Sequence, residues 1–347
     1  MKNNTIKFPV ILASLIALNS SCVKDFLPDS LDAFDPEAGF TTTVYKPQLG
    51  KTTLMTGNFN PGNSTLPFTF EIVNMKRADG REAPELTEFF PVKVWKTPYL
   101  GTETSLAEIE AKRETEYRQL FQVRKHSGEF ILWSNAISSF VVCAPDSGYV
   151  FDVLAQNSGG YKYTTKMRLI PTREVDYEPT NYLGTGLAPN PYVHPTSVTG
   201  VREAEKGLGI TTEDIQVYFR KNTDIEDDGK GKTLTFRFYD SEYHPIDPDK
   251  FNLTRWESLV HGFEMEKTGE YVTYKIAYPI PLLKTVSNYT NPAGDKARVK
   301  FSYNRRNSTG MRVDASISLD FAIYTEAHWE ILFMFVTGDP LFEDGHF

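Results

Sequence analysis

The stretch SGEFILWSNAISSFVVCAPDSGYVFDVLAQNSGGYKYTTKMRLIP, residues 127–171, decides the fold class of this chain. Its apolar runs are short, and Ser-Gly and Gly-Gly pairs separate them, as hairpin connections require. The pattern predicts strands at 129–133, 139–144, 149–156 and 163–171. Short strands joined by such turns are typical of an antiparallel β-sandwich.

The same pattern continues on both sides of this stretch. Further strands are predicted at 66–75, 89–95, 121–125, 215–221, 233–240, 271–278, 297–304, 314–324 and 328–336. One helix interrupts them, because Ser105 and Glu108 form a capping box that predicts a helix over 105–119. We therefore expect an all-β fold of two tandem β-sandwich domains, Ig-like or jelly-roll-like, with one short helix in the first.

Composition divides the chain into five parts. A proline- and glycine-rich stretch cannot support long helices or strands, so we interpret it as an interdomain linker. The predicted parts are a signal peptide at 1–21, an acylated N-terminus and tether at 22–45, a first domain at 46–172, the linker at 173–207 and a second domain at 208–347.

The first residues have the composition of a lipoprotein signal. Lys2 and Lys7 precede an apolar run at 8–18, which is too short to span a bilayer, and Cys22 follows small residues. A cysteine at this place is the usual acceptor of a diacylglyceryl group, which would anchor the protein to a membrane. Asn19 stands where the usual pattern has an aliphatic residue. The alternative is an ordinary secretory signal with a chance cysteine.

Charge and cysteine content exclude some functions. The formal charge is −8, and removal of 1–21 takes away two lysines and no acids, which leaves about −10. So acidic a chain is a poor candidate for nucleic-acid binding, which needs basic patches. Once Cys22 is acylated, Cys143 has no intramolecular disulfide partner. We expect it to be a buried apolar strand residue.

The acidic segment after residue 223 is the best candidate for a metal site. Asp224, Glu226 and Asp228, followed by Gly229, match the first half of a calcium loop. Thr235 stands where such a loop ends in a bidentate glutamate, and a strand follows instead of a helix. Calcium and a solvated hairpin tip are therefore both open. We expect no other cofactor, since the sequence has no phosphate-binding loop, zinc-binding histidine pair or nucleophile elbow.

Aromatic residues are the best candidates for ligand binding. Flat rings stack on sugars, and Trp256 lies in a polar stretch, which predicts a surface ring. The other three tryptophans have apolar neighbours and are predicted to lie in the core. Tyr177, Tyr182 and Tyr192 in the linker either line an interdomain groove or hold the linker against a domain.

Several segments resemble a known family. VKVWKTPYLG (92–101), SLAEIEAKRE (105–114), SGEFILW (127–133) and DSGYVFDV (146–153) are similar to a Bacteroidetes family of uncharacterised surface lipoproteins encoded with SusC/SusD-type nutrient importers. The start of the mature chain, from Cys22 to Asp29, resembles lipoproteins that reach the cell surface. The resemblance implies an outer-membrane location and an importer as partner. It implies no catalytic residues.

These observations lead to three functional hypotheses. The first is a non-catalytic outer-membrane lipoprotein that binds a glycan, or a peptide, and serves a SusC/SusD-type importer. The second is an adhesin or fimbrial subunit, which would also combine a lipid anchor with two β-domains. The third is a glycoside hydrolase, because the spacing of paired carboxylates is set by the fold. Surface and periplasmic orientation are both open.

Overall fold

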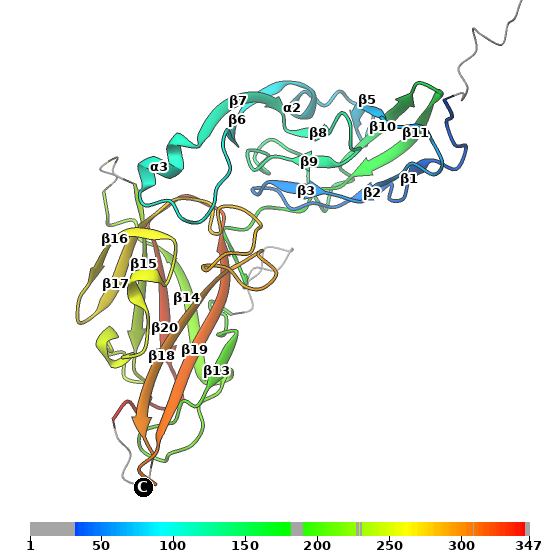
Figure 1. The fold of residues 1–347 in the computed structure, drawn as a ribbon. Helices are drawn as coiled ribbons and strands as arrows, with labels where there is room; N and C mark the ends of the chain where they lie inside the picture. The colour runs from blue at the N-terminus through cyan, green and yellow to red at the C-terminus, as the bar shows by residue number, and fades with distance from the viewer. Residues whose placement is uncertain (1–31, 182–189, 227–228, 230, 308, 344–347) are drawn as a thin grey trace, which may run out of the picture.

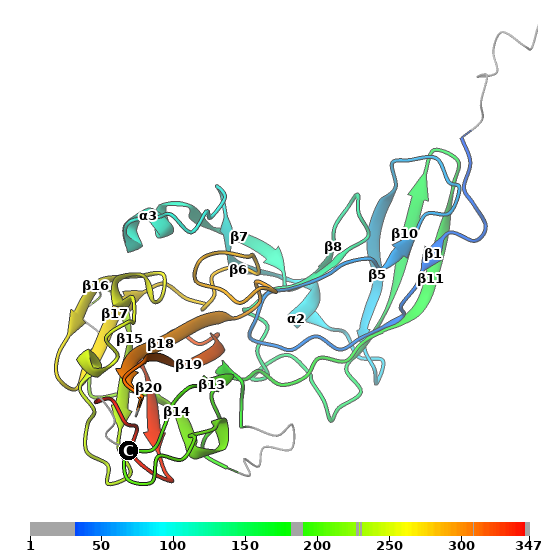
Figure 2. The same cartoon turned by 60° about the horizontal axis from the view of Figure 1, so that its bottom comes forward.

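The computed structural model describes residues 32–181, 190–226, 229, 231–307 and 309–343. Strands dominate it, so the prediction of an all-β fold is confirmed. The strands form an N-terminal half and a C-terminal half, and Figures 1 and 2 show the two halves side by side with α3 above the β16–β17 end of the second. No helix in the described ranges is both long enough and apolar enough to cross a membrane.

The N-terminal half contains four small sheets. Their orders are β1-β4, β2-β11-β10-β5, β3-β9-β8 and β6-β7. The strands are β1 (Gly39–Phe40), β2 (Val44–Tyr45), β3 (Thr53–Met55), β4 (Phe59–Asn60), β5 (Thr69–Arg77), β6 (Phe89–Trp95), β7 (Arg113–Gln119), β8 (Phe121–Val123), β9 (Phe130–Leu132), β10 (Tyr149–Asn157) and β11 (Gly160–Leu169). The helices are α2 (Pro84–Thr87) and α3 (Leu106–Ala111).

The core of this half lies between the sheets that contain β9 and β10. Phe130 on β9 packs against Phe121 on β8 and against Phe151 on β10, with ring centroids 5.3 and 5.7 Å apart. All three rings are buried. Along β10, buried residues alternate with partly exposed residues. The sequence pattern predicts this alternation for a strand with one face in a core.

The C-terminal half contains two larger sheets. One has the order β14-β20-β15-β17-β16, and in the other β19 pairs with β18, β12 and β13. The strands are β12 (Tyr177–Glu178), β13 (Ser197–Thr199), β14 (Ile215–Lys221), β15 (Lys232–Tyr239), β16 (Gly262–Lys267), β17 (Tyr271–Ile276), β18 (Ala297–Arg306), β19 (Arg312–Ile323) and β20 (Trp329–Phe335). Three 3₁₀ turns lie at Thr212–Asp214, Pro248–Lys250 and Trp256–Ser258.

Phe301 on β18 joins the two sheets of the C-terminal half. Its ring centroid lies 5.5 Å from Phe236, 4.8 Å from Phe238 and 5.1 Å from Phe333, which belong to the other sheet. All four rings are fully buried. Edge-to-face contacts of this kind add to the burial of aromatic area, so this cluster is the centre of the C-terminal core.

The predicted helix over 105–119 is only partly correct. Its start is right, because the Ser105 hydroxyl accepts a hydrogen bond from the Glu108 N–H at 3.2 Å. The helix ends at Ala111, and Arg113–Gln119 form β7, which pairs with β6 along its whole length. Seven cross-strand residue pairs with β6 outweigh the helix propensity of the Arg, Glu and Gln residues in this segment.

The strand predicted at 139–144 is wrong. The segment forms turns, and the Val142 N–H donates to the Tyr149 hydroxyl at 2.7 Å instead of joining a ladder. Cys143 is buried, as expected, although not in a strand. Burial raises the pKa of its thiol.

The predicted interdomain linker and the predicted N-terminal tether both contain short strands. In the proline- and glycine-rich stretch, β12 and β13 both pair with β19. In the predicted tether, β1 pairs with β4 and β2 pairs with β11. The ends of both segments therefore pack on the sheets beside them.

We predict that Phe301→Ala destabilises the C-terminal half by about 3–5 kcal/mol, because it removes a buried ring from between two sheets. Phe89→Ala is the matched control, since Phe89 is 64% exposed. Chemical denaturation followed by tryptophan fluorescence measures both changes. Equal effects of the two substitutions would contradict the central role of Phe301.

Candidate functional site

The β6–β7 hairpin forms an arm that connects the two halves. The arm comprises β6, a loop, α3 and β7, residues 89–119, and it extends from the N-terminal half to the C-terminal half (Figure 1). Ile109 on α3 is fully buried against Ala277 and Leu282 of the C-terminal half, and Trp95 and Phe263 pack around them. The arm is therefore attached through a small apolar core of its own.

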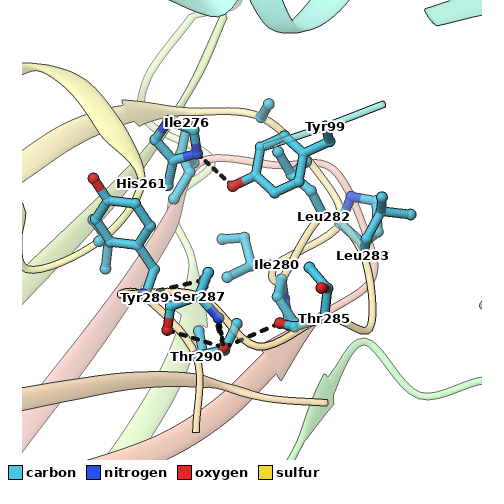
Figure 3. A pocket seen from close by; sticks show the side chains of 15 residues that line it. Tyr99, His261, Ile276, Ile280, Leu282, Leu283, Thr285, Ser287, Tyr289 and Thr290 are labelled. Carbon is cyan, nitrogen blue, oxygen red and sulfur yellow. Dashed lines mark hydrogen bonds between the residues drawn. The ribbon is translucent and has the colours of Figure 1, made fainter. Parts of the chain in front are cut away.

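His261 forms the polar part of this attachment. Its Nε2 lies 2.9 Å from the carbonyl oxygen of Glu103, and its Nδ1 is hydrogen-bonded to the Tyr99 hydroxyl (Figure 3). A carbonyl only accepts, so Nε2 carries a proton and donates. Burial, above all, raises the pKa of Tyr99, so the phenol stays protonated at neutral pH. Tyr289 stacks on His261, with centroids 4.9 Å apart and planes at 2°.

Glu103 fixes the loop that carries Tyr99. Its side chain has no exposed surface, and it accepts hydrogen bonds from Lys112 and from the Leu100 N–H. Burial alone would raise the pKa of Glu103, but these hydrogen bonds outweigh it and lower the pKa to about 2. The carboxylate is therefore charged at neutral pH and ties Leu100 of the loop to Lys112 at the end of α3.

A small apolar cavity lies beside His261. It has a volume of about 30 Å³, and Figure 3 shows Tyr99, Ile280 and Leu282 around it. On the other side, the Thr290 hydroxyl accepts from the Ser287 N–H at 2.8 Å, which fixes the loop there. About one water molecule fits into a space of this size. This cavity is too small for a sugar.

A larger polar cleft lies on another side of the arm. Its volume is about 410 Å³, which is in the range of small-molecule sites. Lys93, Glu110 and Arg113 line it from the arm, and Tyr278 and Glu326 line it from the C-terminal half. Both halves are therefore needed to form the walls of this cleft.

Charged groups in the cleft are held by one another. Glu110 accepts from Lys93 at 2.9 Å and from Arg113 at 3.0 Å. Arg113 also donates to the carbonyl of Tyr278 at 3.0 Å, and its guanidinium lies over the Trp95 ring. Burial, the largest effect, lowers the pKa of Arg113 from its ordinary value. These groups form a preorganised set of donors and acceptors that fits hydroxyl-rich ligands.

The outer face of the arm continues the cleft. Alternation along β6 puts Phe89, Pro91 and Lys93 on one face, and Tyr117 lies opposite Pro91 on that face. Phe89 is 64% exposed and Tyr117 is 70% exposed. Rings exposed next to a polar cleft can stack on the apolar faces of sugars that extend beyond it.

The residues singled out in the sequence lie elsewhere. The prediction that Trp256 is a surface ring is wrong, because it is 5% exposed and packs against Phe238 and Phe301. Its polar neighbours in the sequence form turns around the ring. Tyr177 stacks on Phe219 with centroids 4.3 Å apart, and Tyr192 contacts Tyr218. Neither tyrosine lines the two cavities at the arm.

The remaining candidates are only partly described. Asp224 and Glu226 are exposed, and within the described ranges no group of three or more potential ligands could hold a metal ion. Asp228, Tyr182 and Cys22 lie outside the described residues. Lys93, Glu110, Arg113 and Glu326 were not singled out in the sequence. Only the alternation of β6, which places Lys93 beside exposed rings, would have indicated one of them.

The fold and the cleft define an all-β protein whose two halves are joined by an arm and share one polar site. The chain belongs to the family described as Domain of unknown function (DUF5007), whose model matches residues 59–344. The matched range includes the arm and both walls of the cleft. None of the curated proteins compared with the chain matches it.

We predict that Glu103→Gln lowers stability at pH 7 by roughly 1–3 kcal/mol, because it removes a charged partner of Lys112. The pKa of Glu103 is about 2 in the folded protein and ordinarily 4.5, so its contribution is complete above pH 4.5 and is lost as the pH falls toward 2. The difference between parent and variant should shrink across that interval.

Denaturant titrations at a series of pH values measure this difference. Glu114→Gln, which removes a half-exposed partner of Lys96, serves as the control and should change stability little. A gap between parent and Glu103→Gln that stays constant from pH 7 to pH 2 would show that the charge of Glu103 does not stabilise the arm.

Proposed function

We propose that the protein is a non-catalytic outer-membrane lipoprotein, anchored through Cys22, that binds a glycan for a SusC/SusD-type nutrient importer. The observation that carries ligand binding is the polar cleft of about 410 Å³ between the arm and the C-terminal half. The lipoprotein signal supports the anchor. The resemblance to lipoproteins encoded with such importers supports the partner.

A glycan fits the site better than a peptide. Lys93, Glu110 and Arg113 offer charged donors and acceptors to hydroxyl groups, and Phe89 and Tyr117 offer exposed rings on the adjoining face. Sugars present both kinds of surface on every unit. We therefore expect an oligosaccharide to bind with one end in the cleft and with further units along the arm. In this proposal the two halves are two β-sandwich domains, and the bound oligosaccharide lies between them.

The adhesin hypothesis is less well supported. A donated strand needs an open place in a sheet or a free strand at the end of the chain. In the described residues the last strand, β20, lies between β14 and β15 and pairs with both. It is a central strand of its own sheet and is not available for exchange without unfolding.

Glycoside hydrolysis is a second candidate function, favoured by one observation. Glu110 and Glu326 both line the cleft, and paired carboxylates flanking one substrate are what such enzymes use. Glu110 is held in place by ion pairs with Lys93 and Arg113. Release of reducing sugar by the parent, abolished in both Glu110→Gln and Glu326→Gln, would establish the enzyme and overturn the non-catalytic proposal.

We predict that Lys93→Ala weakens binding of an oligosaccharide about tenfold, because it removes one charge-assisted hydrogen bond of about 1.5 kcal/mol. Tyr117→Ala should weaken longer oligosaccharides more than short ones. Lys96→Ala is the matched control, since Lys96 is a similarly exposed lysine of the same arm that does not line the cleft.

Calorimetry with a panel of oligosaccharides of different sugar composition and length measures these affinities. Binding that is unchanged in Lys93→Ala and in Tyr117→Ala would exclude the cleft as the site. If no member of the panel binds the parent, the glycan proposal is wrong for these substrates.

Partnership with the importer needs a separate experiment. We predict that a C-terminally tagged copy, purified from detergent-solubilised outer membranes, brings down a SusC/SusD-type pair in stoichiometric amount. Mass spectrometry identifies the pair, and Cys22→Ala, which removes the acylation site, should abolish recovery from the membrane fraction. Recovery of the protein alone or as homopolymers would contradict the importer role.

A further inference from the structure

The free end of the β10–β11 hairpin is where the described chain begins. The Asn157 side chain, at the end of β10, donates to the carbonyl of Ala33 at 2.9 Å, and the Thr65 N–H donates to the same oxygen. Gly160 lies against the Phe34 side chain. These contacts fix the first described residues to the end of the N-terminal half that points away from the C-terminal half (Figure 1).

Exposed apolar side chains gather at this end, which we call the tip. Tyr161 is 69% exposed and Tyr163 is 52% exposed, and their ring centroids lie 5.8 Å apart on one face of β11. Leu66 is 68% exposed and follows Thr65, whose carbonyl accepts from the Asn157 amide at 2.7 Å. Tyr161 and Tyr163 contact each other, but most of their ring surface and that of Leu66 is exposed, and apolar surface left in water is costly.

We propose that the tip contacts the lipid surface of the membrane that holds the anchor. This inference rests on the proposed acylation of Cys22. Asp32 lies only ten positions after Cys22, and a chain of that length spans at most about 35 Å. The lipid therefore keeps the tip close to the membrane. Tyrosine is the residue type that favours the membrane–water interface, because its ring is apolar and its hydroxyl is polar.

Charge at the tip limits the kind of lipid. Asp32 and Glu37 are exposed there, and hydrogen bonds from the backbone of Asn63 and Glu37 lower the pKa of Asp35. Lys162, between the two tyrosines, donates to the carbonyls of Pro36 and Ala38. The tip thus carries charged carboxylates, so it should favour zwitterionic over anionic lipid surfaces.

Quenching by brominated lipid tests the contact directly. The full chain is purified from membranes and reconstituted into phosphatidylcholine vesicles whose acyl chains are brominated near the head group. Tyr161→Trp adds a fluorophore at the tip, and Tyr243→Trp is the matched control, since Tyr243 is 70% exposed in the C-terminal half. The emission that each substitution adds to the parent is compared in brominated and plain vesicles.

We predict that brominated vesicles remove most of the emission added by Tyr161→Trp and leave that of Tyr243→Trp unchanged. Anionic lipid in the vesicles should reduce the quenching. If the protein floats with the vesicles but Tyr161→Trp is quenched no more than Tyr243→Trp, the anchor stands and the tip contact is wrong. If the protein does not float with vesicles, both the anchor and the contact are wrong.

Discussion

The buried carboxylate of Glu103 is the constraint on which the junction depends. Lys112 and the Leu100 N–H both donate to Oε1 of this carboxylate, so its buried charge is stabilised only when the loop brings both donors to it. In that conformation the Glu103 carbonyl accepts from His261 and the Tyr99 ring lies on the C-terminal half. The placement of the arm thus depends on the ion pair between Glu103 and Lys112.

The cleft also depends on the docking of the arm, because neither half forms the cleft alone. Lys93 and Glu110 come from the arm, while Tyr278 and Glu326 come from the C-terminal half. Arg113 ties the two walls together through its bond to the Tyr278 carbonyl. A ligand that touches both walls binds only the docked arrangement, so binding and docking stabilise each other by the same free energy.

Local patterns predicted much of the fold and little of the site. Strands such as β17 were predictable because alternation survives in them, and every second residue of β17 is buried. The end of α3 was not predictable, because it is set by the pairing of β7 with β6. That pairing depends on residues in another part of the chain. Trp256 was misplaced because its polar neighbours lie in turns that cover the ring. The cleft joins Lys93 to Glu326, and no local pattern links residues so far apart in the sequence.

The position of the cleft within the elongated arrangement is consistent with the proposed function. A soluble polymer cannot approach a site that lies flat on a membrane, because the lipid surface excludes it. The first described residues lie at the tip, and the arm extends from the opposite end of the N-terminal half (Figure 1). With the proposed anchor on Cys22, the N-terminal half would act as a spacer. A long glycan could reach the cleft while its remaining units stay in solvent, at the height where an importer's outer surface would meet them.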